Sequence, residues 1–223
     1  MEGLTIAIPK GKLYEPTVAL LTRAGLGGDA LGPEDSRRLM FESAAGDVRF
    51  LVARPADVPT YVAHGAADLG VVGKDVLLED TQTYTELLDL GFGGCRMVLA
   101  VRAELAATAA AAGTPLRLPT GRTVARVATK FPRVTERFFT EQGWPAQIIV
   151  LHGAVELASA VGLADAIVDI VSTGQTLREN HLVPLQEIAR STVRLIANPA
   201  ALHLKRQRLE EIVRRLRRLT EEG

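Results

Sequence analysis

The sequence predicts an α/β fold built as two lobes, and three observations support that prediction. Short apolar strands alternate with helices over roughly the first 90 residues. The same alternation begins again near residue 96 and runs to about 180. A late apolar strand at 193–197 follows this second series, and we expect it to return to the first lobe. Strands that alternate with helices are typical of open sheets covered by helices on their faces.

The first lobe is expected to consist of short strands, each followed by a turn and a helix. Its expected elements are strands at 4–8, 48–52 and 67–72 and helices at 13–24 and 57–64. The first helix has apolar residues at helical spacing and is followed by Gly25, which suits a C-terminal cap. Asp57 is expected to cap the second helix, since a carboxylate accepts hydrogen bonds from the first free amides. We therefore expect a largely parallel sheet in this lobe.

The second lobe repeats the pattern between residues 91 and 179. Its expected elements are strands at 97–101, 126–129, 147–151 and 164–171 and helices at 134–142, at 153–162 and after 176. In the helix at 153–162, Val155, Leu157 and Ala158 are expected to face the core. The Ala-rich stretch at 104–113 is interpreted as a helix or a mobile surface segment. The predicted domains are 1–90 together with 180–223, and 91–179.

The segment at 202–222 predicts an amphipathic helix whose second face is rich in arginine. Its apolar face consists of Leu204, Leu209, Ile212, Val213, Leu216 and Leu219. Packing of this face on its own lobe is the first interpretation, and docking of a partner subunit through Leu209, Ile212 and Leu216 is the second. RNA binding is the weakest interpretation, because the arginines are interrupted by Glu210, Glu211, Glu221 and Glu222.

The composition is that of a globular protein without a general field for binding polyanions. Of 223 residues, 47% are hydrophobic and 23% are charged, which argues against a disordered chain. Lys and Arg together number 26, as do Asp and Glu together, so the chain has no overall positive charge. Any phosphate site must therefore depend on a local arrangement of residues. Aromatic residues make up only 4%, too few for the platforms on which single-stranded nucleic acids stack. No nucleic-acid partner is therefore expected.

Neither a disulfide, a metal site nor a membrane segment is expected. Cys95 is the one cysteine, and no metal-ligand spacing relates the four histidines, His64, His152, His181 and His203. The short apolar stretch near the N-terminus has no basic segment ahead of it, and no apolar run approaches the roughly 20 residues of a membrane span. We therefore expect a cytoplasmic protein that holds no metal with its own side chains.

The most informative segment begins as an apolar strand at 164–171 and continues as Ser-Thr-Gly-Gln-Thr at 172–176. Three hydroxyls and a glycine at the start of a helix direct side-chain donors and free backbone N–H groups to one point, which suits a phosphate. The glycine lets the backbone approach closely. Asp169, near the end of the strand, can accept hydrogen bonds from sugar hydroxyls. The alternative interpretation makes Ser172 and Thr176 simple helix caps.

A phosphate site beside a sugar-binding carboxylate suggests a phosphoribosyl group, and here the sequence resembles a known family. The segment at 164–177 resembles the phosphoribosyl-pyrophosphate loop of the ATP phosphoribosyltransferases. Six further blocks match that family in order, at 8–13, 54–62, 67–75, 88–96, 153–158 and 162–166. The chain departs from the family at Lys12, where the opening motif commonly has Arg. A lysine can contact a phosphate but lacks the bidentate fork of arginine.

The resemblance implies two α/β lobes like those of type II periplasmic binding proteins, with the active site in the cleft between them. It implies transfer of the 5-phosphoribosyl group of phosphoribosyl pyrophosphate to N1 of ATP, with release of pyrophosphate, as the first step of histidine biosynthesis. Mg²⁺ is expected to arrive on the pyrophosphate of the substrate. Long-form members continue into a histidine-sensing domain, which we do not expect in this protein. The resemblance therefore implies a short form that works with a regulatory subunit resembling histidyl-tRNA synthetase, in a hetero-octamer.

The resemblance also implies roles for individual residues. Catalytic roles are expected for Lys10, Arg54 and Asp169. The residues expected to bind phosphoribosyl pyrophosphate are Glu156, Asp169, Ser172, Thr173, Gly174, Gln175 and Thr176. Those expected to bind ATP are Lys10, Gly11, Lys12, Arg54, Asp68 and Gly73. Simpler alternatives are a solvated Glu156, an ion pair between Arg54 and Asp57, and exposed turn lysines at positions 10 and 12.

Three other functions compete with this interpretation. An intracellular solute-binding module would keep the lobes without the chemistry, but a phosphate-type loop counts against it. A phosphoribosyltransferase of another class would carry two adjacent acidic residues before the loop, whereas Asp169 is followed by Ile170. A regulatory subunit with a dead site is disfavoured by the intact segment at 169–176. Turnover of both substrates separates the three.

Overall fold

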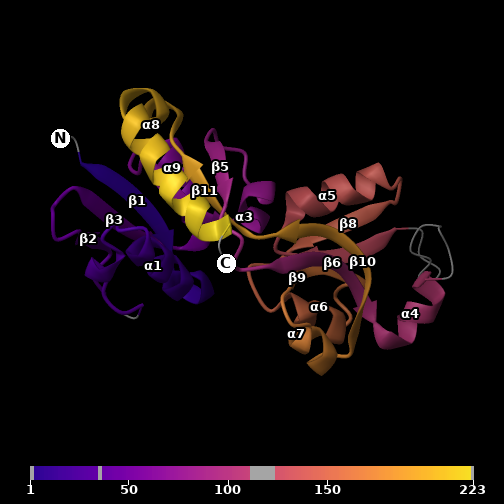
Figure 1. Ribbon diagram of the computed structural model, residues 1–223. Helices are drawn as coiled ribbons and strands as arrows, with labels where there is room; N and C mark the ends of the chain where they lie inside the picture. Colours follow the sequence, from indigo (N-terminus) through magenta and orange to yellow (C-terminus); the bar gives the residue numbers. More distant parts are fainter. Residues whose placement is uncertain (1–2, 35–36, 111–123, 222–223) are drawn as a thin grey trace. The chain divides into compact units, whose positions relative to one another are not determined.

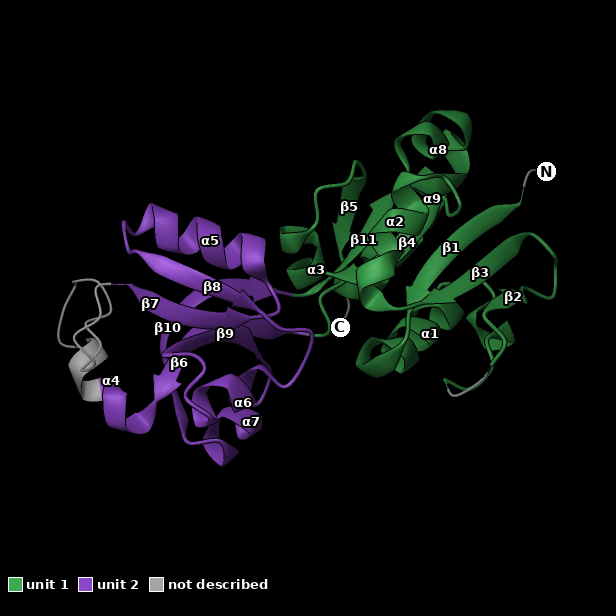
Figure 2. Cartoon of the chain, turned by 180° about the vertical axis from the view of Figure 1, so that it is seen from behind, with its two compact units in different colours: residues 1–93, 192–223 green, residues 94–191 purple. Residues whose placement is uncertain are grey.

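The computed structural model describes residues 3–34, 37–110 and 124–221, and the chain forms two compact units. Figure 2 colours unit 1, which is Met1–Gly93 with Thr192–Gly223, apart from unit 2, which is Gly94–Ser191. The chain therefore returns to unit 1 after Ser191, whereas the sequence predicted a boundary near 180. The reason is the long strand β10 (Leu182–Ser191), which pairs antiparallel with β6 (Cys95–Arg102) and so belongs to unit 2.

Unit 1 is built on a six-stranded sheet of order β2-β3-β1-β4-β11-β5 (Figure 1). The strands are β1 (Leu4–Pro9), β2 (Met40–Glu42), β3 (Val48–Ala53), β4 (Leu69–Gly73), β5 (Thr85–Asp89) and β11 (Val193–Ala197). Only β3, β1 and β4 run parallel, and the other three strands pair antiparallel. The sheet is thus mixed and not largely parallel. The predicted return of the late strand to the first lobe is confirmed, since β11 lies between β4 and β5.

Short helices connect the strands of unit 1. They are the 3-10 turns Gly11–Leu13, Gly28–Ala30 and Pro55–Asp57 and the helices α1 (Tyr14–Arg23), α2 (Val58–Ala63), α3 (Lys74–Glu79), α8 (Pro199–Leu204) and α9 (Arg206–Glu221). Helix α1 ends as predicted, because Gly25 follows it with φ +66°, a conformation that glycine adopts without strain. The predicted cap at Asp57 is wrong. Its backbone is already helical and its side chain accepts no capping hydrogen bond.

Helix α9 packs its apolar stripe into the core of unit 1. Leu209, Ile212 and Leu216 are at most 3% exposed and join the cluster formed by the strands and α1. Burial of a leucine or isoleucine side chain stabilises a fold by roughly 1.5–3 kcal/mol, so these three residues hold the helix in place. The interpretation that the helix packs on its own lobe is confirmed, and docking of a partner through these residues is excluded. Leu204 belongs to α8 and is 78% exposed.

Unit 2 has a five-stranded sheet of order β10-β6-β9-β7-β8. Besides β6 and β10, its strands are β7 (Ala125–Thr129), β8 (Ala146–Val150) and β9 (Ala166–Val171). Its helices are α4 (Ala103–Ala110), α5 (Pro132–Glu141), α6 (Val155–Ala160) and α7 (Gln175–Glu179). Strands β8, β7 and β9 run parallel, so their carboxyl ends share one edge of the sheet. The helix predicted at 104–113 is observed as far as residue 110, and positions 111–113 lie outside the described residues.

Helices cover both faces of the unit 2 sheet, with α5 on one side and α6 and α7 on the other (Figure 1). On the second side, Val155 and Ala158 pack with Ile167 of β9. Leu157, which was also predicted to face the core, is 57% exposed, because α6 turns that position away from the sheet. At the opposite edge of the sheet from the carboxyl ends, the Arg126 guanidinium binds the buried Asp165 carboxylate at 2.9 Å. This pair fixes the amino ends of β7 and β9.

Candidate functional site

The phosphate-type loop of unit 2 joins the carboxyl end of β9 to α7. Gly174 is the N-cap of the helix with φ +76°, a left-handed conformation that favours glycine. Ser172, Thr173 and Thr176 expose their side chains around it. Within the described residues, neither Ser172 nor Thr176 makes a side-chain hydrogen bond to the helix, and the cap position has no side chain. The alternative that these hydroxyls serve only as helix caps is therefore wrong, and they are available to a ligand.

The Asp169 carboxylate lies two residues before the end of β9 and is partly buried. Burial raises the pKa of Asp169, and the negative charge of Glu156 raises it further. Two features lower this pKa. They are the Ile170 backbone N–H, which donates to the carboxylate at 2.8 Å, and the positive charge of Lys130. No ion pair neutralises the carboxylate within the described part of the chain. An acidic group with a shifted pKa at a sheet edge is a candidate for binding hydroxyl donors.

Glu156 lies in the first turn of α6, and its charge acts on the pKa of Asp169. The residue before this helix, Ala154, has φ +46°, and His181 is the other non-glycine residue with positive φ among the described residues. A left-handed alanine costs roughly 1–2 kcal/mol, and such strain tends to persist at functional sites. The strain starts α6 so that Val155 is buried while Glu156 lies near Asp169. Sequence reasoning singled out Glu156 but had no signal for the strain at Ala154.

Unit 1 brings three of its predicted site residues to the carboxyl edge of its parallel strands. Pro9 of β1 pairs with Ala53 of β3, so Lys10 and Arg54 follow at the same level. The Lys10 N–H donates to the Ala53 carbonyl at 2.8 Å, which fixes the two chain segments together. The register of β1 with β4 puts Gly73 at this level too. Two cations and a glycine therefore share one edge of the sheet.

The turn after β1 carries Gly11 and Lys12, both exposed. Gly11 has φ +80°, and its N–H donates to the Glu34 carboxylate at 2.8 Å. Glu34 is a neighbour of this turn that sequence reasoning missed, because nothing in the sequence relates it to position 11. The alternative of an ion pair between Arg54 and Asp57 is not observed. Between these two residues the described structure has only a backbone hydrogen bond, from the Asp57 N–H to the Arg54 carbonyl.

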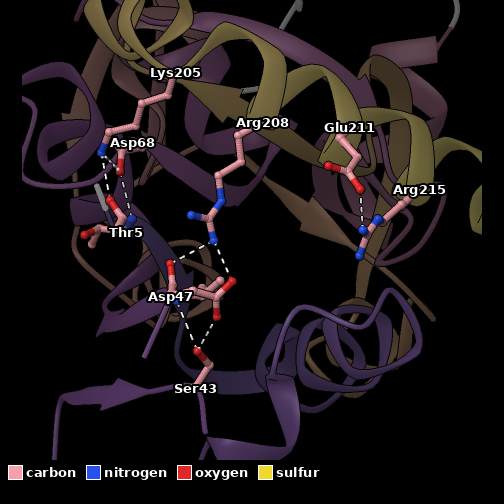
Figure 3. A network of polar contacts seen from close by, with 10 residues as sticks. Thr5, Ser43, Asp47, Asp68, Lys205, Arg208, Glu211 and Arg215 are labelled. Carbon is pink, nitrogen blue, oxygen red and sulfur yellow. Dashed lines mark hydrogen bonds and ion pairs between the residues drawn. The ribbon is translucent and has the colours of Figure 1, made fainter. Parts of the chain in front are cut away.

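Asp68 lies away from the other predicted ATP-binding residues. It precedes β4, level with Thr5 at the amino end of β1, and so occupies the opposite edge of the sheet from Lys10. Its carboxylate accepts the Thr5 N–H at 2.8 Å and pairs with Lys205 at 2.9 Å, as Figure 3 shows. This placement does not support the predicted ATP contact of Asp68, which stays a prediction. This carboxylate connects the segment between α8 and α9 to the sheet.

A hollow of about 840 Å³ lies beside α9 in unit 1 and is lined by charged residues. Arg208 pairs with Asp47 at 2.7 Å, and Arg215 pairs with Glu211 (Figure 3). A hydrogen bond from Ser43 and the charge of Arg208 lower the pKa of Asp47, so that carboxylate stays ionised. Arg208 and Arg215, two of the cations that line this hollow, therefore already face anions.

The described residues contain neither a cluster suited to a metal ion nor a helix suited to a membrane. No group of three or more His, Cys, Asp or Glu side chains there is arranged to hold a metal ion. The helices in the same residues are too short or too polar to cross a bilayer.

Comparison with known proteins agrees with the resemblance inferred from the sequence. The profile of the HisG family, described as ATP phosphoribosyltransferase, matches residues 54–218. An ATP phosphoribosyltransferase of Symbiobacterium thermophilum is 52% identical over 98% of this chain and 96% of its own length. One of Desulfitobacterium hafniense is 49% identical over 97% of this chain and 96% of its own length.

Solved structures give the same result. A structure described as the ATP phosphoribosyl transferase (HisG:HisZ) complex from Thermotoga maritima has a chain that is 36% identical, with a TM-score of 0.79 over 99% of this chain and 100% of that chain. The VFT2 domain of Bordetella pertussis BvgS superimposes with a TM-score of 0.56 over 96% of this chain and 86% of that chain. At 12% identity, the second likeness concerns the fold alone. The family profile and the full-length relatives together show that this chain belongs to the ATP phosphoribosyltransferase family.

Proposed function

We propose that this chain transfers the 5-phosphoribosyl group of phosphoribosyl pyrophosphate to N1 of ATP and releases pyrophosphate, the first step of histidine biosynthesis. One observation carries the assignment of the donor site to unit 2. The exposed hydroxyls of Ser172, Thr173 and Thr176 lie at the same sheet edge as the Asp169 carboxylate, which has no ion pair among the described residues, in a chain of this family. The loop binds the 5-phosphate of the donor. Asp169 and Glu156 accept hydrogen bonds from its ribose hydroxyls.

The proposed reaction is a substitution at the anomeric carbon of the ribose. The lone pair of N1 forms the new bond to this carbon while the bond to the pyrophosphate oxygen breaks, and its electron pair leaves with pyrophosphate. Positive charge develops on the sugar and negative charge on the leaving oxygens. The protein then contributes positioning and electrostatic stabilisation, and no covalent intermediate is needed.

Unit 1 supplies the cationic edge in this proposal. Lys10, Lys12 and Arg54 bind the phosphates of ATP, and Gly11 and Gly73 let the backbone approach the nucleotide. Lys10 and Arg54 also stabilise the charge that develops during transfer. Mg²⁺ enters as part of the donor substrate, on the pyrophosphate oxygens, and water completes its coordination. That the two substrates meet between the lobes stays a prediction.

We further propose that the chain is a short-form catalytic subunit of a cytoplasmic hetero-oligomer. The Thermotoga structure described as a HisG:HisZ complex supports this, because its similar chain is matched over its full length. The partner is a regulatory subunit resembling histidyl-tRNA synthetase, and the assembly is a hetero-octamer. Leu209, Ile212 and Leu216 are buried in unit 1, so the partner has to contact other residues.

The test is release of pyrophosphate by the purified chain with ATP, phosphoribosyl pyrophosphate and Mg²⁺, with and without the synthetase-like subunit. Release that requires both substrates is expected, and dependence on the partner would support the short form. Absence of release in both arrangements, with the chain folded, would contradict the transferase. Binding of a small solute under those conditions would favour the solute-binding module instead.

A further inference from the structure

Lys130 is a cation at the donor edge of unit 2 to which the function described above gives no task. It follows directly after β7, whose parallel pairing with β9 matches Thr129 to Val168. The next residues on the two strands are Lys130 and Asp169. Neighbouring strands lie roughly 4.8 Å apart, so the two side chains start within reach of a common ligand.

The alternation of side chains along β7 and β9, extended by one residue past Thr129, assigns Lys130 and Asp169 to the same face of the sheet. Ala128, two residues before Lys130, packs in one cluster with Ile167, two residues before Asp169. Side chains alternate along a strand, so positions two apart share a face. The positive charge of Lys130 lowers the pKa of Asp169, which agrees with this proximity.

The backbone around Lys130 is held by hydrogen bonds on both sides. The Phe131 N–H donates to the Thr129 hydroxyl at 2.9 Å, and the Leu151 N–H donates to the Thr129 carbonyl at 2.9 Å. The Thr135 hydroxyl donates to the Phe131 carbonyl at 2.7 Å. Lys130 itself is exposed. A fixed backbone therefore presents a mobile ammonium to solvent at the carboxyl edge.

We propose that Lys130 binds the pyrophosphate of the ribosyl donor and so acts as a catalytic residue on the leaving group. This inference rests on the function proposed above. With the 5-phosphate on the loop at 172–176 and the ribose over Asp169, the pyrophosphate at the far side of the ribose needs a cation. The strand order of unit 2 puts β7 beside β9, and Lys130 is the basic residue that β7 delivers to this edge. A lysine is well suited to a phosphate as a point charge that follows the departing group.

The experiment compares two ligands, phosphoribosyl pyrophosphate with Mg²⁺ and ribose 5-phosphate, by calorimetry on the full chain. In Lys130→Met, the Kd of phosphoribosyl pyrophosphate is expected to rise by about 10- to 100-fold, because one charge-assisted contact with the pyrophosphate is lost. The Kd of ribose 5-phosphate, which lacks the pyrophosphate, should change less than about twofold. Lys130→Arg should recover most of the lost affinity, since it keeps the charge.

Arg137→Met is the matched control, because Arg137 is an exposed cation on α5 of the same unit. It should leave both dissociation constants unchanged, and the melting temperatures of all variants should match the wild type. An equal loss of affinity for both ligands in Lys130→Met would place the lysine on the sugar or on Asp169 and overturn the proposal. Unchanged affinity for both would overturn it too. Failure of the proposed function would look different from both of these outcomes. In that case the wild-type chain itself would bind neither ligand and would release no pyrophosphate.

Discussion

Asp68 in unit 1 and Asp169 in unit 2 look alike in the sequence, since each adjoins an apolar strand, and the structure gives them opposite environments. Asp68 lies at the amino end of its strand, where it accepts the Thr5 N–H and pairs with Lys205. Asp169 lies near the carboxyl end of its strand and has a raised pKa and no ion pair within the described residues. One carboxylate is used by the fold, and the other is left for a ligand.

The difference follows from strand direction. In an open α/β sheet, ligands bind beyond the carboxyl ends of the strands, where loops leave the sheet without crossing it. At the amino ends, chain segments return and their polar groups are satisfied by the fold, as Asp68 and Asp165 both illustrate. A carboxylate therefore has to be assigned to an end of its strand before it can be assigned a function.

The largest expected effect is on turnover, in Asp169→Asn. Loss of the carboxylate that holds the ribose should lower kcat/KM for phosphoribosyl pyrophosphate by about 10³-fold, which corresponds to roughly 4 kcal/mol of transition-state stabilisation. The melting temperature at pH 7 should stay equal to that of the wild type or exceed it, because the charged form of a group with a raised pKa is disfavoured in the folded state. Steady-state kinetics and calorimetric melts would test both.

The sign of the pH dependence sharpens this test. Because the pKa of Asp169 is raised in the folded protein, the folded state binds this proton more tightly than the unfolded chain does. The stability cost of the carboxylate therefore appears as pH rises from about 4, the ordinary Asp value, through the raised value. The melting temperature of Asp169→Asn should match the wild type at the acidic end of this window. The stability advantage of the variant over the wild type should grow toward neutral pH, and the reverse trend would contradict the assignment.

The second expected effect is on stability, in Asp68→Asn. Asp68 and Lys205 are 15% and 19% exposed, so loss of one partner should cost about 2 kcal/mol, between the values for exposed and buried pairs. Activity per folded molecule should remain within about twofold of the wild type. Urea denaturation would measure the loss, and Glu210→Gln, which breaks the exposed pair with Arg206, should cost much less. A large fall in kcat/KM with intact stability would return Asp68 to the active site.

Most of the fold was predictable from the sequence, and the predictions that failed did so for physical reasons. Apolar runs placed β1, β3, β4, β6, β7, β8 and β9, because a buried strand excludes polar residues. Strand β10 was missed as a unit 2 element, since only its two end residues are buried and its sequence has no apolar run. The interface hypothesis for Leu209, Ile212 and Leu216 failed because an amphipathic stripe does not say which surface covers it.

The candidate site was predictable only where residues are close in sequence. The loop at 172–176 and its neighbour Asp169 form one segment, so their meeting required no long-range information. Lys130 and Asp169 meet through the register of β7 with β9, and Gly11 meets Glu34 across a loop. Neither contact leaves a trace in the sequence. The ion pair of Asp68 could not be predicted for the same reason, because its partner Lys205 is distant along the chain.

A third and smaller effect is expected for Gly174→Ala. An alanine at φ +76° costs roughly 1–2 kcal/mol, and its Cβ would lie 3.3 Å from Nη1 of Arg178, a flexible group that can move aside. The loop should shift, and KM for phosphoribosyl pyrophosphate should rise about tenfold. Gly143→Ala is the matched control, because Gly143 has φ +68° and open space around it, far from the loop in sequence. Both variants should lose similar stability, but only Gly174→Ala should change KM for phosphoribosyl pyrophosphate. An equal KM in the two variants would show that the loop is not part of the site.

The smallest expected effect is at the unit 1 edge, in Lys12→Arg, which introduces the residue that the family commonly has. Lys12 is exposed in the turn after β1, so the larger guanidinium fits without repacking. An arginine adds a second parallel hydrogen bond to a phosphate, and KM for ATP should fall by about two- to threefold with kcat unchanged. Lys12→Met should raise the same KM. If both variants keep the wild-type KM for ATP, Lys12 is a solvated turn residue. Of the three cations proposed to bind ATP, only Lys10 and Arg54 would then remain.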